Sequence, residues 1–327
     1  MARAIDWEGR IGRRLRLRDL HVFFAVVQSG SMAKAAVQLR VKQPSVSKAI
    51  GDLEAALAVR LFDRSPQGVR PTIYGDALIE CGMAVFDQLK QGIGKIEFLS
   101  DPGTGEVRIG CVPSMTATIV PSVIRRFARQ YPRAIVHVDE VGSPAQVAGL
   151  RERKYDFTIT RTQEPRIDEW DDLNAEILFY DELVVAAGSQ SRWARRRHID
   201  LAELVHERWI VAAAFSWNYK RLREAFQARG LGMPTAGLVT LSNHIVARLL
   251  ADGDYVTAFP GSWVRFNGLG VLPVDLPVRP WPVAILTLKN RTLSPVVGRF
   301  IASMREAVKS LVKPAGRTTR PSKPNVS

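Results

Sequence analysis

The chain has 327 residues, of which 46% are hydrophobic and 24% are charged, and its formal net charge is +14. This length allows two or three domains with cores of their own, and the composition is that of a soluble globular protein. No apolar run approaches the ~20 residues of a membrane span, and residues 1–19 lack the apolar core of a signal peptide.

The positive charge is concentrated at the two ends of the chain. Residues 1–75 contain 13 lysines and arginines against 6 acidic residues, and residues 313–327 contain 4 basic residues and no acid. The remaining residues 76–312 carry a net charge of only +3. This distribution indicates a polyanion as partner, and the alternative is that the basic ends only aid solubility. We expect residues 1–16 and 313–327 to be disordered basic extensions.

Two short helices are predicted after a first helix at about residues 18–28. Apolar residues follow helical spacing at Met32, Ala35, Ala36 and Leu39, and again at Val46, Ile50, Leu53 and Leu57. Only residues 40–43 separate the two stripes, so the helices must cross steeply, as in a helix-turn-helix. Pro44 suits the first turn of the second helix, because an N–H is not needed there.

The second helix has a polar side that suits nucleic acid. Gln43, Ser45, Ser47 and Lys48 lie on it, and amide, hydroxyl and lysine groups reach base edges and phosphates. A turn-rich segment follows and predicts a short hairpin, or wing, with Arg64 and Arg70 at its ends. The alternative is the solvated face of an unrelated helical hairpin, and the wing favours DNA binding over it.

This segment resembles the winged helix-turn-helix of LysR-type transcriptional regulators. The matching positions are Leu20, Phe23, Val26, Gly30, Ser31, Ala35, Ala36, Leu39, Gln43, Pro44, Ser45, Val46, Ser47, Ile50, Leu53, Glu54, Leu57, Leu61, Phe62, Arg64 and residues 71–75. Two positions depart from the family pattern: Met32, where Phe is usual, and Lys42, where Ser or Thr caps the second helix. We expect a DNA phosphate to compensate for the missing cap at Lys42.

The resemblance implies a DNA-binding domain at residues 17–73. Its expected DNA contacts are Ser31, Lys42, Gln43, Pro44, Ser45, Ser47, Lys48, Arg64 and Arg70.

A long helix is predicted from about residue 74 to residue 99. Its apolar residues recur in steps of three and four, at Leu78, Cys81, Val85, Leu89, Ile93, Ile96 and Leu99. So narrow a stripe favours a contact between two helices over a broad core, and the resemblance implies a linker helix that pairs two protomers. We expect dimerisation through Leu78, Val85, Leu89 and Ile96, within a linker and hinge of residues 74–105. Gly82, Gly92 and Gly94 predict that the helix bends or frays before the breaker at residues 101–105.

From Glu106 onwards strands and helices alternate, which predicts a mainly parallel sheet. Strands are expected at residues 107–112, 135–141, 157–160, 183–186, 209–212, 237–240, 256–259 and 283–288, and helices at 118–131, 145–153, 220–229, 243–252 and 295–311. Two such sets resemble the two-lobed effector-binding domain of the same family, which is like a type 2 periplasmic binding protein. The predicted fold class is therefore multidomain: an all-α winged helix-turn-helix domain, a long linker helix and a two-lobed α/β domain.

We expect this effector-binding domain to span residues 106–312. Lobe 1 is placed at about 106–160 together with 283–312, and lobe 2 at about 161–282.

Ligands of two-lobed α/β folds bind where strands end and helices begin. The loops after four predicted strands carry Ser114, Met115, Thr116, Ser143, Arg161 and Phe215, and the resemblance implies that these loops line the effector cleft. Free N–H groups at residues 113–116, together with Arg161, favour an organic anion such as a carboxylate. The alternatives stay open: Ser114 and Ser143 could cap helices, Arg161 could form an interlobe ion pair, and Phe215 could be core.

No catalytic or metal-binding arrangement is evident in the sequence. The five histidines lack ligand spacing, and the nucleophile-elbow, dinucleotide-binding and P-loop motifs are absent. We therefore expect no enzyme activity, no cofactor and no metal. Cys81 and Cys111 are the only cysteines, which favours two reduced thiols in a cytoplasmic protein over a redox switch or an oxidising compartment.

The predicted function is a DNA-binding transcriptional regulator that controls promoters in response to a small-molecule effector. The expected partners are double-stranded promoter DNA, the effector, further copies of the chain in a homodimer or homotetramer, and RNA polymerase if the protein activates. No membrane partner is expected. The alternative from another class is a solute-binding protein without a transcriptional role, which would need a signal peptide.

Overall fold

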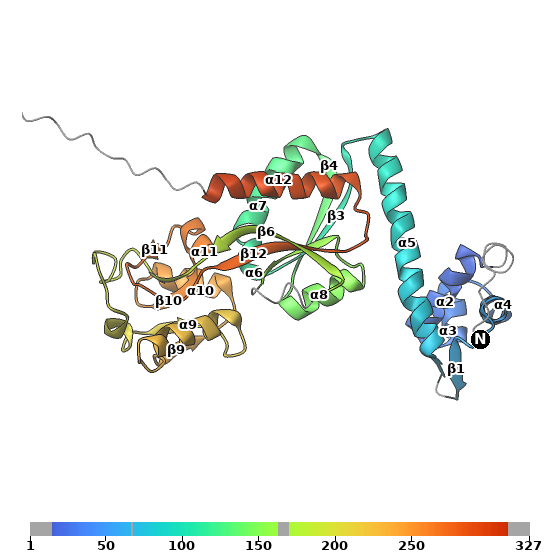
Figure 1. Ribbon diagram of the computed structural model, residues 1–327, viewed down its shortest axis with the longest axis horizontal. Coiled ribbons are helices and arrows are strands. Elements are labelled where there is room, and N and C mark those ends of the chain that lie inside the picture. The colour runs from blue at the N-terminus through green and yellow to red at the C-terminus, as the bar shows by residue number, and fades with distance from the viewer. Residues whose placement is uncertain (1–14, 67, 163–169, 313–327) are drawn as a thin grey trace, which may run out of the picture. The chain divides into compact units, whose positions relative to one another are not determined.

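The computed structural model describes residues 15–66, 68–162 and 170–312 (Figure 1). Apart from residues 15 and 16, the two extensions predicted to be disordered lie outside the described residues. The chain divides into two compact units, residues 1–90 and residues 91–327. We call the first unit the head and the second the α/β unit.

The head is built from three helices and a hairpin. These are α2 (Leu17–Ser29), α3 (Met32–Leu39), α4 (Gln43–Leu57), β1 (Phe62–Ser65) and β2 (Gly68–Pro71). Their apolar sides meet in one core, which fully buries Phe23, Val26, Ala35, Val46, Ile50, Leu53 and Leu61. Helices α2 and α3 are bent by 120°, and Gly30 ends α2 with a φ of 63°, a conformation that suits glycine. The predicted helix-turn-helix and wing are confirmed.

Helix α4 begins without a side-chain cap, as predicted. Lys42 stands at the N-cap position and its side chain makes no capping hydrogen bond, while Pro44 lies in the first turn. The neighbouring helix α3 differs, because the Ser31 hydroxyl accepts a hydrogen bond from the Lys34 N–H at 3.5 Å. The first turn of α4 therefore has no side-chain acceptor of its own.

Helix α5 (Ile73–Ser100) is continuous over 28 residues. The expected fraying before Asp101 therefore does not occur, even though four glycines lie in the helix. Gly82 has a packing reason, because a Cβ at this position would lie 2.8 Å from a ring carbon of Phe24. The missing side chain lets α5 approach α2 closely.

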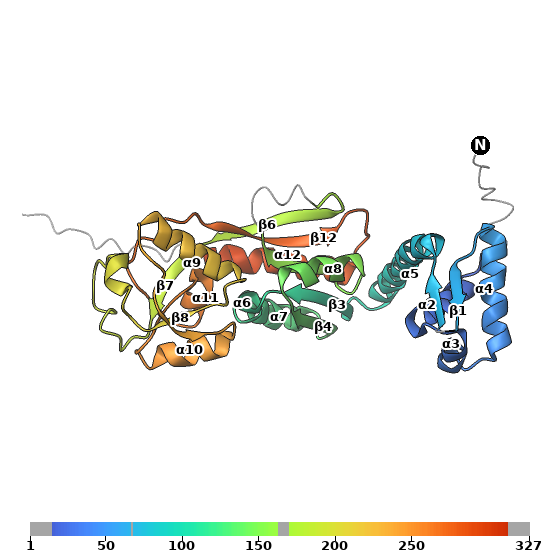
Figure 2. The same ribbon diagram turned by 90° about the horizontal axis from the view of Figure 1, so that it is seen from below.

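The α/β unit contains two five-stranded sheets (Figure 2). The first sheet has the order β4-β3-β5-β12-β6, from β3 (Thr104–Cys111), β4 (Arg133–Glu140), β5 (Phe157–Arg161), β6 (Leu173–Asp181) and β12 (Trp281–Leu288). Helices α7 (Ile119–Gln130) and α12 (Pro295–Val312) share the core on one face, while α8 (Ser143–Arg151) packs with Leu286 on the other. With the short helix α6 (Pro113–Thr116), these elements form lobe 1.

The second sheet has the order β11-β7-β10-β8-β9 and is the centre of lobe 2. Its strands are β7 (Leu183–Ala187), β8 (Trp209–Val211), β9 (Ala236–Val239), β10 (Val256–Pro260) and β11 (Gly270–Val271). Helix α9 (Trp217–Ala228) and the turn η2 (Leu201–Leu204) pack into one core of this lobe. Helices α10 (Asn243–Ala251) and α11 (Gly261–Phe266) pack into the other.

Three sequence expectations about this unit are corrected by the sheet topology. Both sheets are mixed rather than mainly parallel, because β12 runs antiparallel to β5 and β6, and β7 runs antiparallel to β10 and β11. Strand β6 was not predicted, and its residues, assigned to lobe 2, pair with β12 in lobe 1. The chain therefore crosses between the lobes at residues 181–183, and not directly after Arg161.

Strand β12 carries the chain back between the lobes. Its first residue, Trp281, is buried in the core of lobe 2, whereas Val283 is buried in the core of lobe 1. Lobe 1 is also held by a buried ion pair between Arg291 and Asp156 at 3.0 Å, with side chains 2% and 8% exposed. Asp156 further accepts the Arg108 N–H at 2.9 Å, so the network ties the segment before α12 to β3.

Within the described ranges, no single helix is long and apolar enough to cross a bilayer. Helices α2 and α3 together have such a composition, but the pair is sharply bent and its apolar side chains fill the core of the head.

Candidate nucleic-acid interface and ligand cleft

Helix α4 presents its polar side to solvent. The candidates on it are exposed at Lys42, Gln43, Pro44, Ser45 and Lys48 and half-buried at Ser47. The opposite side of the helix is buried in the core of the head, which fixes the rotation of the helix about its axis. One continuous face of donors and acceptors results, as a major-groove reader requires.

A hollow of about 440 Å³ lies beside this face and extends it towards α2. Its polar lining comes from Arg16, Arg18, Asp19, His21, Ser45, Lys48 and Asp52. Sequence reasoning did not place Arg18 and His21 in the interface, since only the packing of α2 against α4 brings them there. The cations of this hollow add phosphate-binding capacity beside Lys48.

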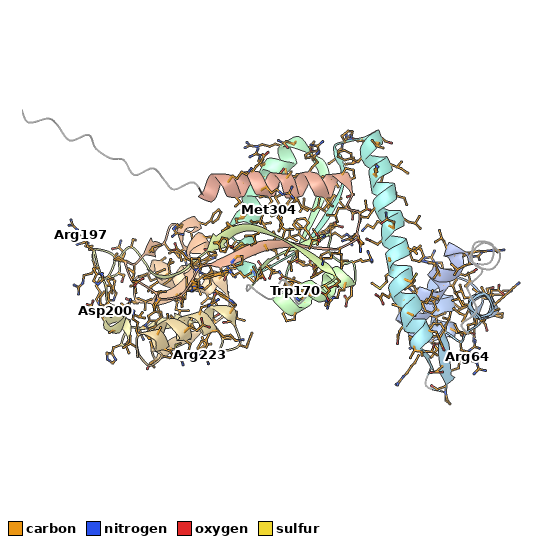
Figure 3. The ribbon with its side chains drawn as sticks, viewed as in Figure 1. Arg64, Trp170, Arg197, Asp200, Arg223 and Met304 are labelled. Carbon is orange, nitrogen blue, oxygen red and sulfur yellow. The ribbon has the colours of Figure 1, made fainter. Side chains whose placement is uncertain are left out.

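The wing places its two arginines on opposite faces. In the hairpin Arg64 pairs with Val69, and Asp63 pairs with Arg70. Because cross-strand partners share a face and sequence neighbours alternate, Arg64 lies on the side that faces the core. Its guanidinium is 3.9 Å from the Glu54 carboxylate of α4 (Figure 3). Arg70 lies on the outer side and is exposed, so Arg70 is better placed for DNA.

Ser31 and Glu54 both have structural partners. Ser31 caps α3, and its carbonyl oxygen accepts the Ser29 hydroxyl at 2.9 Å. Glu54 accepts the N–H of Leu61 at 2.8 Å, which holds the start of the wing against α4. Ser31 therefore has a structural role as a helix cap.

Helix α5 exposes an apolar row along its length. Leu78 and Val85 are half-buried, whereas Leu89 is 42% exposed and Ile96 is 65% exposed. Ile93 and Leu99 on the same stripe are 55% and 72% exposed. A row of exposed aliphatic side chains at this spacing is a surface that a second helix would cover.

In the α/β unit, Arg161 and Ser114 meet although 47 residues separate them in sequence. Arg161 ends β5 and Ser114 lies in α6 after β3, and these two strands are neighbours in the sheet. The Arg161 guanidinium donates a hydrogen bond to the Ser114 hydroxyl, and Ser114 is only 5% exposed. Two of the predicted ligand-binding residues are thus in contact, because both lie at the ends of neighbouring strands.

The Arg161 side chain is half-buried against the strand that returns from lobe 2. Its guanidinium carbon is 5.9 Å from the ring centre of Trp281. Its Nε is buried and has no hydrogen-bond partner among the described residues. Burial lowers the pKa of Arg161, and the nearby Asp181 carboxylate partly opposes this shift.

Asp181 does not form a direct ion pair with Arg161 within the described residues. Its carboxylate instead accepts the Ser262 N–H at 3.0 Å and the Ser262 hydroxyl at 2.6 Å. These bonds tie the first turn of α11 to the crossing between the lobes. Arg161 and Asp181 thus attract each other only over a longer distance, and do not form the direct ion pair that was the alternative for Arg161.

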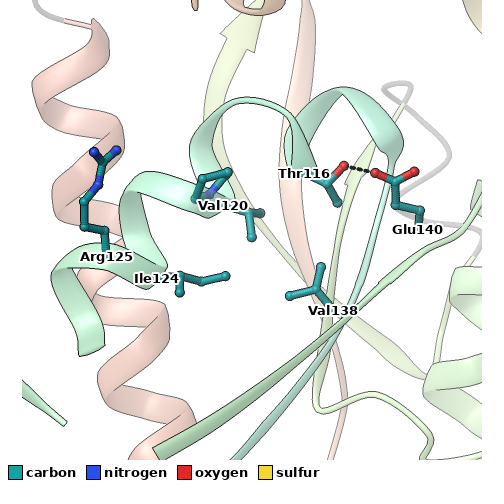
Figure 4. A pocket seen from close by; sticks show the side chains of 7 residues that line it. Thr116, Val120, Ile124, Arg125, Val138 and Glu140 are labelled. Atoms are coloured by element: carbon teal, nitrogen blue, oxygen red, sulfur yellow. Dashed lines mark hydrogen bonds between the residues drawn. The ribbon is translucent and has the colours of Figure 1, made fainter. Parts of the chain in front are cut away.

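Thr116 joins the other end of α6 to the end of β4. Its hydroxyl donates a hydrogen bond to the Glu140 carboxylate (Figure 4). Thr116 and Glu140 line two hollows, one of about 480 Å³ beside α7 and β4 and one of about 230 Å³ between the lobes. The hollow beside α7 is completed by Val120, Pro121, Ile124, Arg125 and Val138.

The interlobe hollow takes its second wall from the loop between β9 and α10. Residues 241–244 line it opposite Pro113, Thr116, Ala117 and Glu140. Sequence reasoning missed Glu140 and the polar residues Ser242, Asn243 and His244. Ser242 caps α10 by accepting the Ile245 N–H at 3.4 Å, so the strand-end rule applied to β9 would have found this loop.

The remaining cleft candidates lie in different surroundings. Met115 is fully buried in the core of lobe 1, and the N–H groups of Met115 and Thr116 both donate to the Val112 carbonyl, at 2.9 and 3.4 Å. The free N–H groups expected at residues 113–116 are thus partly used within the turn. Phe215 is 76% exposed. Ser143 begins α8, and its side chain lies outside the described residues.

Among the described residues, no group of three His, Cys, Asp or Glu side chains is arranged to hold a metal ion. Cys111 is buried beside the cleft, and burial raises the pKa of its thiol well above its usual range, which keeps the thiol neutral.

Comparison with known families decides the identity of both units. Residues 17–76 match the family described as bacterial regulatory helix-turn-helix protein, lysR family. Residues 100–309, more than half of the chain, match the LysR substrate binding domain. The chain belongs to the LysR family. It is a LysR-type transcriptional regulator, and the alternative of a solute-binding protein without a transcriptional role is set aside.

LysR-family relatives resemble this chain over nearly its whole length. It is 28% identical to the uncharacterized HTH-type transcriptional regulator YdcI of Escherichia coli strain K12, over 90% of this chain and 97% of YdcI. It is also 28% identical to the HTH-type transcriptional regulator GbpR of Azospirillum brasilense, over 94% of this chain and 91% of GbpR. A full-length OxyR variant from Pseudomonas aeruginosa shares the fold with a TM-score of 0.61 and 20% identity, over 90% of this chain and 95% of OxyR.

Proposed function

We propose that this LysR-type regulator reads promoter DNA through the exposed face of α4. Gln43, Ser45, Ser47 and Lys48 contact base edges or phosphates in the major groove. Lys42 pairs with a phosphate at the helix start, where no side-chain cap competes with it. Arg70 on the outer side of the wing and the arginines of the hollow beside α4 contact phosphates.

We further propose that a small organic anion, such as a carboxylate, is the effector. The observation that carries this proposal is the Nε of Arg161, a buried donor without a partner among the described residues at a strand end between two lobes. A buried unpaired donor is costly, and a bound carboxylate would satisfy it with a charge-assisted hydrogen bond. Ser114 and Thr116 supply hydroxyls beside it, and Phe215 offers an exposed apolar surface. Met115 is not among the proposed effector contacts, because its side chain is buried in the core of lobe 1.

The effector acts by changing the angle between the lobes. Within the described part of the chain, the backbone passes between the lobes only at residues 181–183 and at β12. A ligand that contacts both walls therefore favours one closure state over another. In an oligomer, such a change alters the spacing of the DNA-binding heads. We propose that dimers form through the exposed row of α5, that paired dimers form a tetramer, and that RNA polymerase is contacted if the regulator activates.

The protein works in the cytoplasm and performs no catalysis in this proposal. The support is the family, whose members are DNA-binding transcriptional regulators.

Thermal unfolding of the full chain with a panel of small carboxylates tests the effector proposal. Tryptophan fluorescence reports the α/β unit, because six of the seven tryptophans lie at positions 170–281. A ligand at 100 times its Kd stabilises its domain by ~2.7 kcal/mol, which raises the melting temperature by several degrees. Arg161→Met should abolish the shift for the best carboxylate, whereas Arg223→Met on the outer side of α9 should keep it. A carboxylate shift that persists in Arg161→Met contradicts the assignment.

A further inference from the structure

Two hydroxyls of the short helix α6 hold side chains of opposite charge. Ser114 accepts a hydrogen bond from the Arg161 guanidinium, and two residues later Thr116 donates one to the Glu140 carboxylate. A cation and an anion are thus fixed by hydroxyls of the same turn. Because both bonds go to α6, the two charged groups lie on the same face of the lobe 1 sheet as this helix.

The strand register confirms this arrangement and fixes the spacing. Glu140 on β4 pairs with Cys111 on β3, and Cys111 pairs with Ile159 on β5. Paired residues of neighbouring strands point to the same face, and Arg161, two residues after Ile159, points there as well. Two strand spacings across and two residues along place the Cα atoms of Glu140 and Arg161 roughly 12 Å apart. The two side chains reach across part of this distance, so groups that bind them both lie several bonds apart.

Neither charge is neutralised by a neighbour within the described residues. Arg161 has Ser114 as its hydrogen-bond partner, and its Nε has none. Glu140 is exposed, bonds to Thr116 and forms no ion pair with a described residue. The Asp181 carboxylate attracts Arg161 at longer range, but its two oxygens accept hydrogen bonds from Ser262. Cys111 lies between the two charges as a neutral, fully buried thiol and competes with neither.

Glu140 also faces the second lobe. It lines the interlobe hollow of about 230 Å³ together with Asn243 and His244, which begin α10. A ligand in this hollow touches both lobes at once. A carboxylate lining an anion-binding cleft repels a simple anion, which is a cost unless the ligand carries a group that the carboxylate attracts.

We propose that the effector is bipolar, a small amino acid whose carboxylate binds Arg161 and Ser114 and whose ammonium group binds Glu140 and Thr116. This inference rests on the proposed function, because it assigns the substrate class of the same cleft. It adds Glu140 as a specificity-determining residue. Glu140 selects amino acids over plain carboxylates, since a carboxylate lacking the ammonium group leaves Glu140 unpaired next to a second negative charge.

Four matched pairs of compounds test the proposal by isothermal titration of the full chain. They are β-alanine with propionate, 4-aminobutyrate with butyrate, 5-aminovalerate with valerate, and 6-aminohexanoate with hexanoate. In at least one pair the amino compound should bind about tenfold more tightly, the effect of one charge-assisted contact. Glu140→Gln should remove this preference while keeping carboxylate binding. The matched control Glu106→Gln, on the same sheet at the opposite end of β3, should leave the preference unchanged.

The possible failures are distinguishable. If the plain carboxylates bind as well as their amino partners, or if the preference survives in Glu140→Gln, the bipolar effector is wrong and the anion site stands. If 3-hydroxypropionate or 4-hydroxybutyrate matches the corresponding amino compound, Glu140 takes a hydroxyl, and the amino acid assignment is overturned. If no compound binds, or if Arg161→Met binds each compound like the parent chain, the proposed effector site itself fails and this inference fails with it.

Discussion

The head and the α/β unit use charge in opposite ways. The head displays Lys42, Lys48 and Arg70 on an open surface, where each is exposed to water. The α/β unit instead partly buries Arg161 against Trp281, with one donor that has no partner among the described residues. Exposed charges attract a polyanion over a distance and are screened by salt, whereas a desolvated charge is strong only towards a group that enters its cleft. The difference suits one unit to DNA and the other to a small ligand.

Helix α5 lies outside this contrast, because its exposed side chains are apolar. Leu89→Glu with Ile96→Glu should break the proposed dimer, since burying each aliphatic side chain is worth ~1.5–3 kcal/mol and the two-fold axis doubles the loss. Multi-angle light scattering should show a smaller assembly with weak DNA binding. The control Lys95→Glu changes charge at an exposed position off the row and should keep the oligomer. An unchanged assembly in the double variant would remove α5 from the interface.

The contrast between buried and exposed charges can be sharpened within lobe 1. Arg291→Met leaves Asp156 as a buried unpaired charge, and breaking such a pair typically costs about 3–5 kcal/mol. Urea unfolding followed by tryptophan fluorescence should show this loss. The matched variant Arg126→Met breaks the exposed pair with Glu306 and should cost less than ~1 kcal/mol. Equal losses in the two variants would show that burial does not set the strength of these pairs.

The two arginines of the wing allow the two faces of the hairpin to be compared. Arg70→Ala should weaken binding to specific and random DNA alike, by about 1 kcal/mol, and lower the salt slope by ~1, as the loss of one phosphate contact does. Arg64→Ala should have a smaller effect on the salt slope, because Arg64 faces Glu54 on the other side of the hairpin. Fluorescence anisotropy at several salt concentrations measures both slopes. The reverse order would place the DNA on the inner side of the wing.

Features formed by residues close together in the sequence could be predicted, whereas contacts between residues far apart in the sequence could not be foreseen in full. In the head, each helix of the helix-turn-helix is given by an apolar stripe within one segment, so its existence, its uncapped start and its polar face could be predicted. In the α/β unit, most helices and strands could be predicted for the same reason. The pairing of Glu140 with Thr116 and of Arg161 with Ser114 could not be foreseen in full, because it depends on which strands are neighbours.

Strand β6 shows why one element of lobe 1 was missed. Its pairing with β12 shifts register between Val283 and Ala284, so one residue of β6 has no partner and the alternation of buried and exposed positions is broken. A period of two is the main sequence signal of a strand, and this strand does not keep it. Because β6 is missing from the prediction, the predicted crossing between the lobes lies after Arg161, whereas the observed crossing lies at residues 181–183. The opposite faces of Arg64 and Arg70 likewise follow only from the hairpin register.

The most direct test of the central claim, that α4 reads DNA sequence, is selection from a random duplex library. The full chain should enrich one sequence with two-fold symmetry, because a dimer presents two equivalent heads. The double variant Ser47→Ala with Lys48→Ala, shown by circular dichroism to be folded, should bind random DNA but enrich that sequence weakly or not at all. Enrichment of the same sequence to the same extent by the variant, or no enriched sequence with the parent chain, would contradict the account.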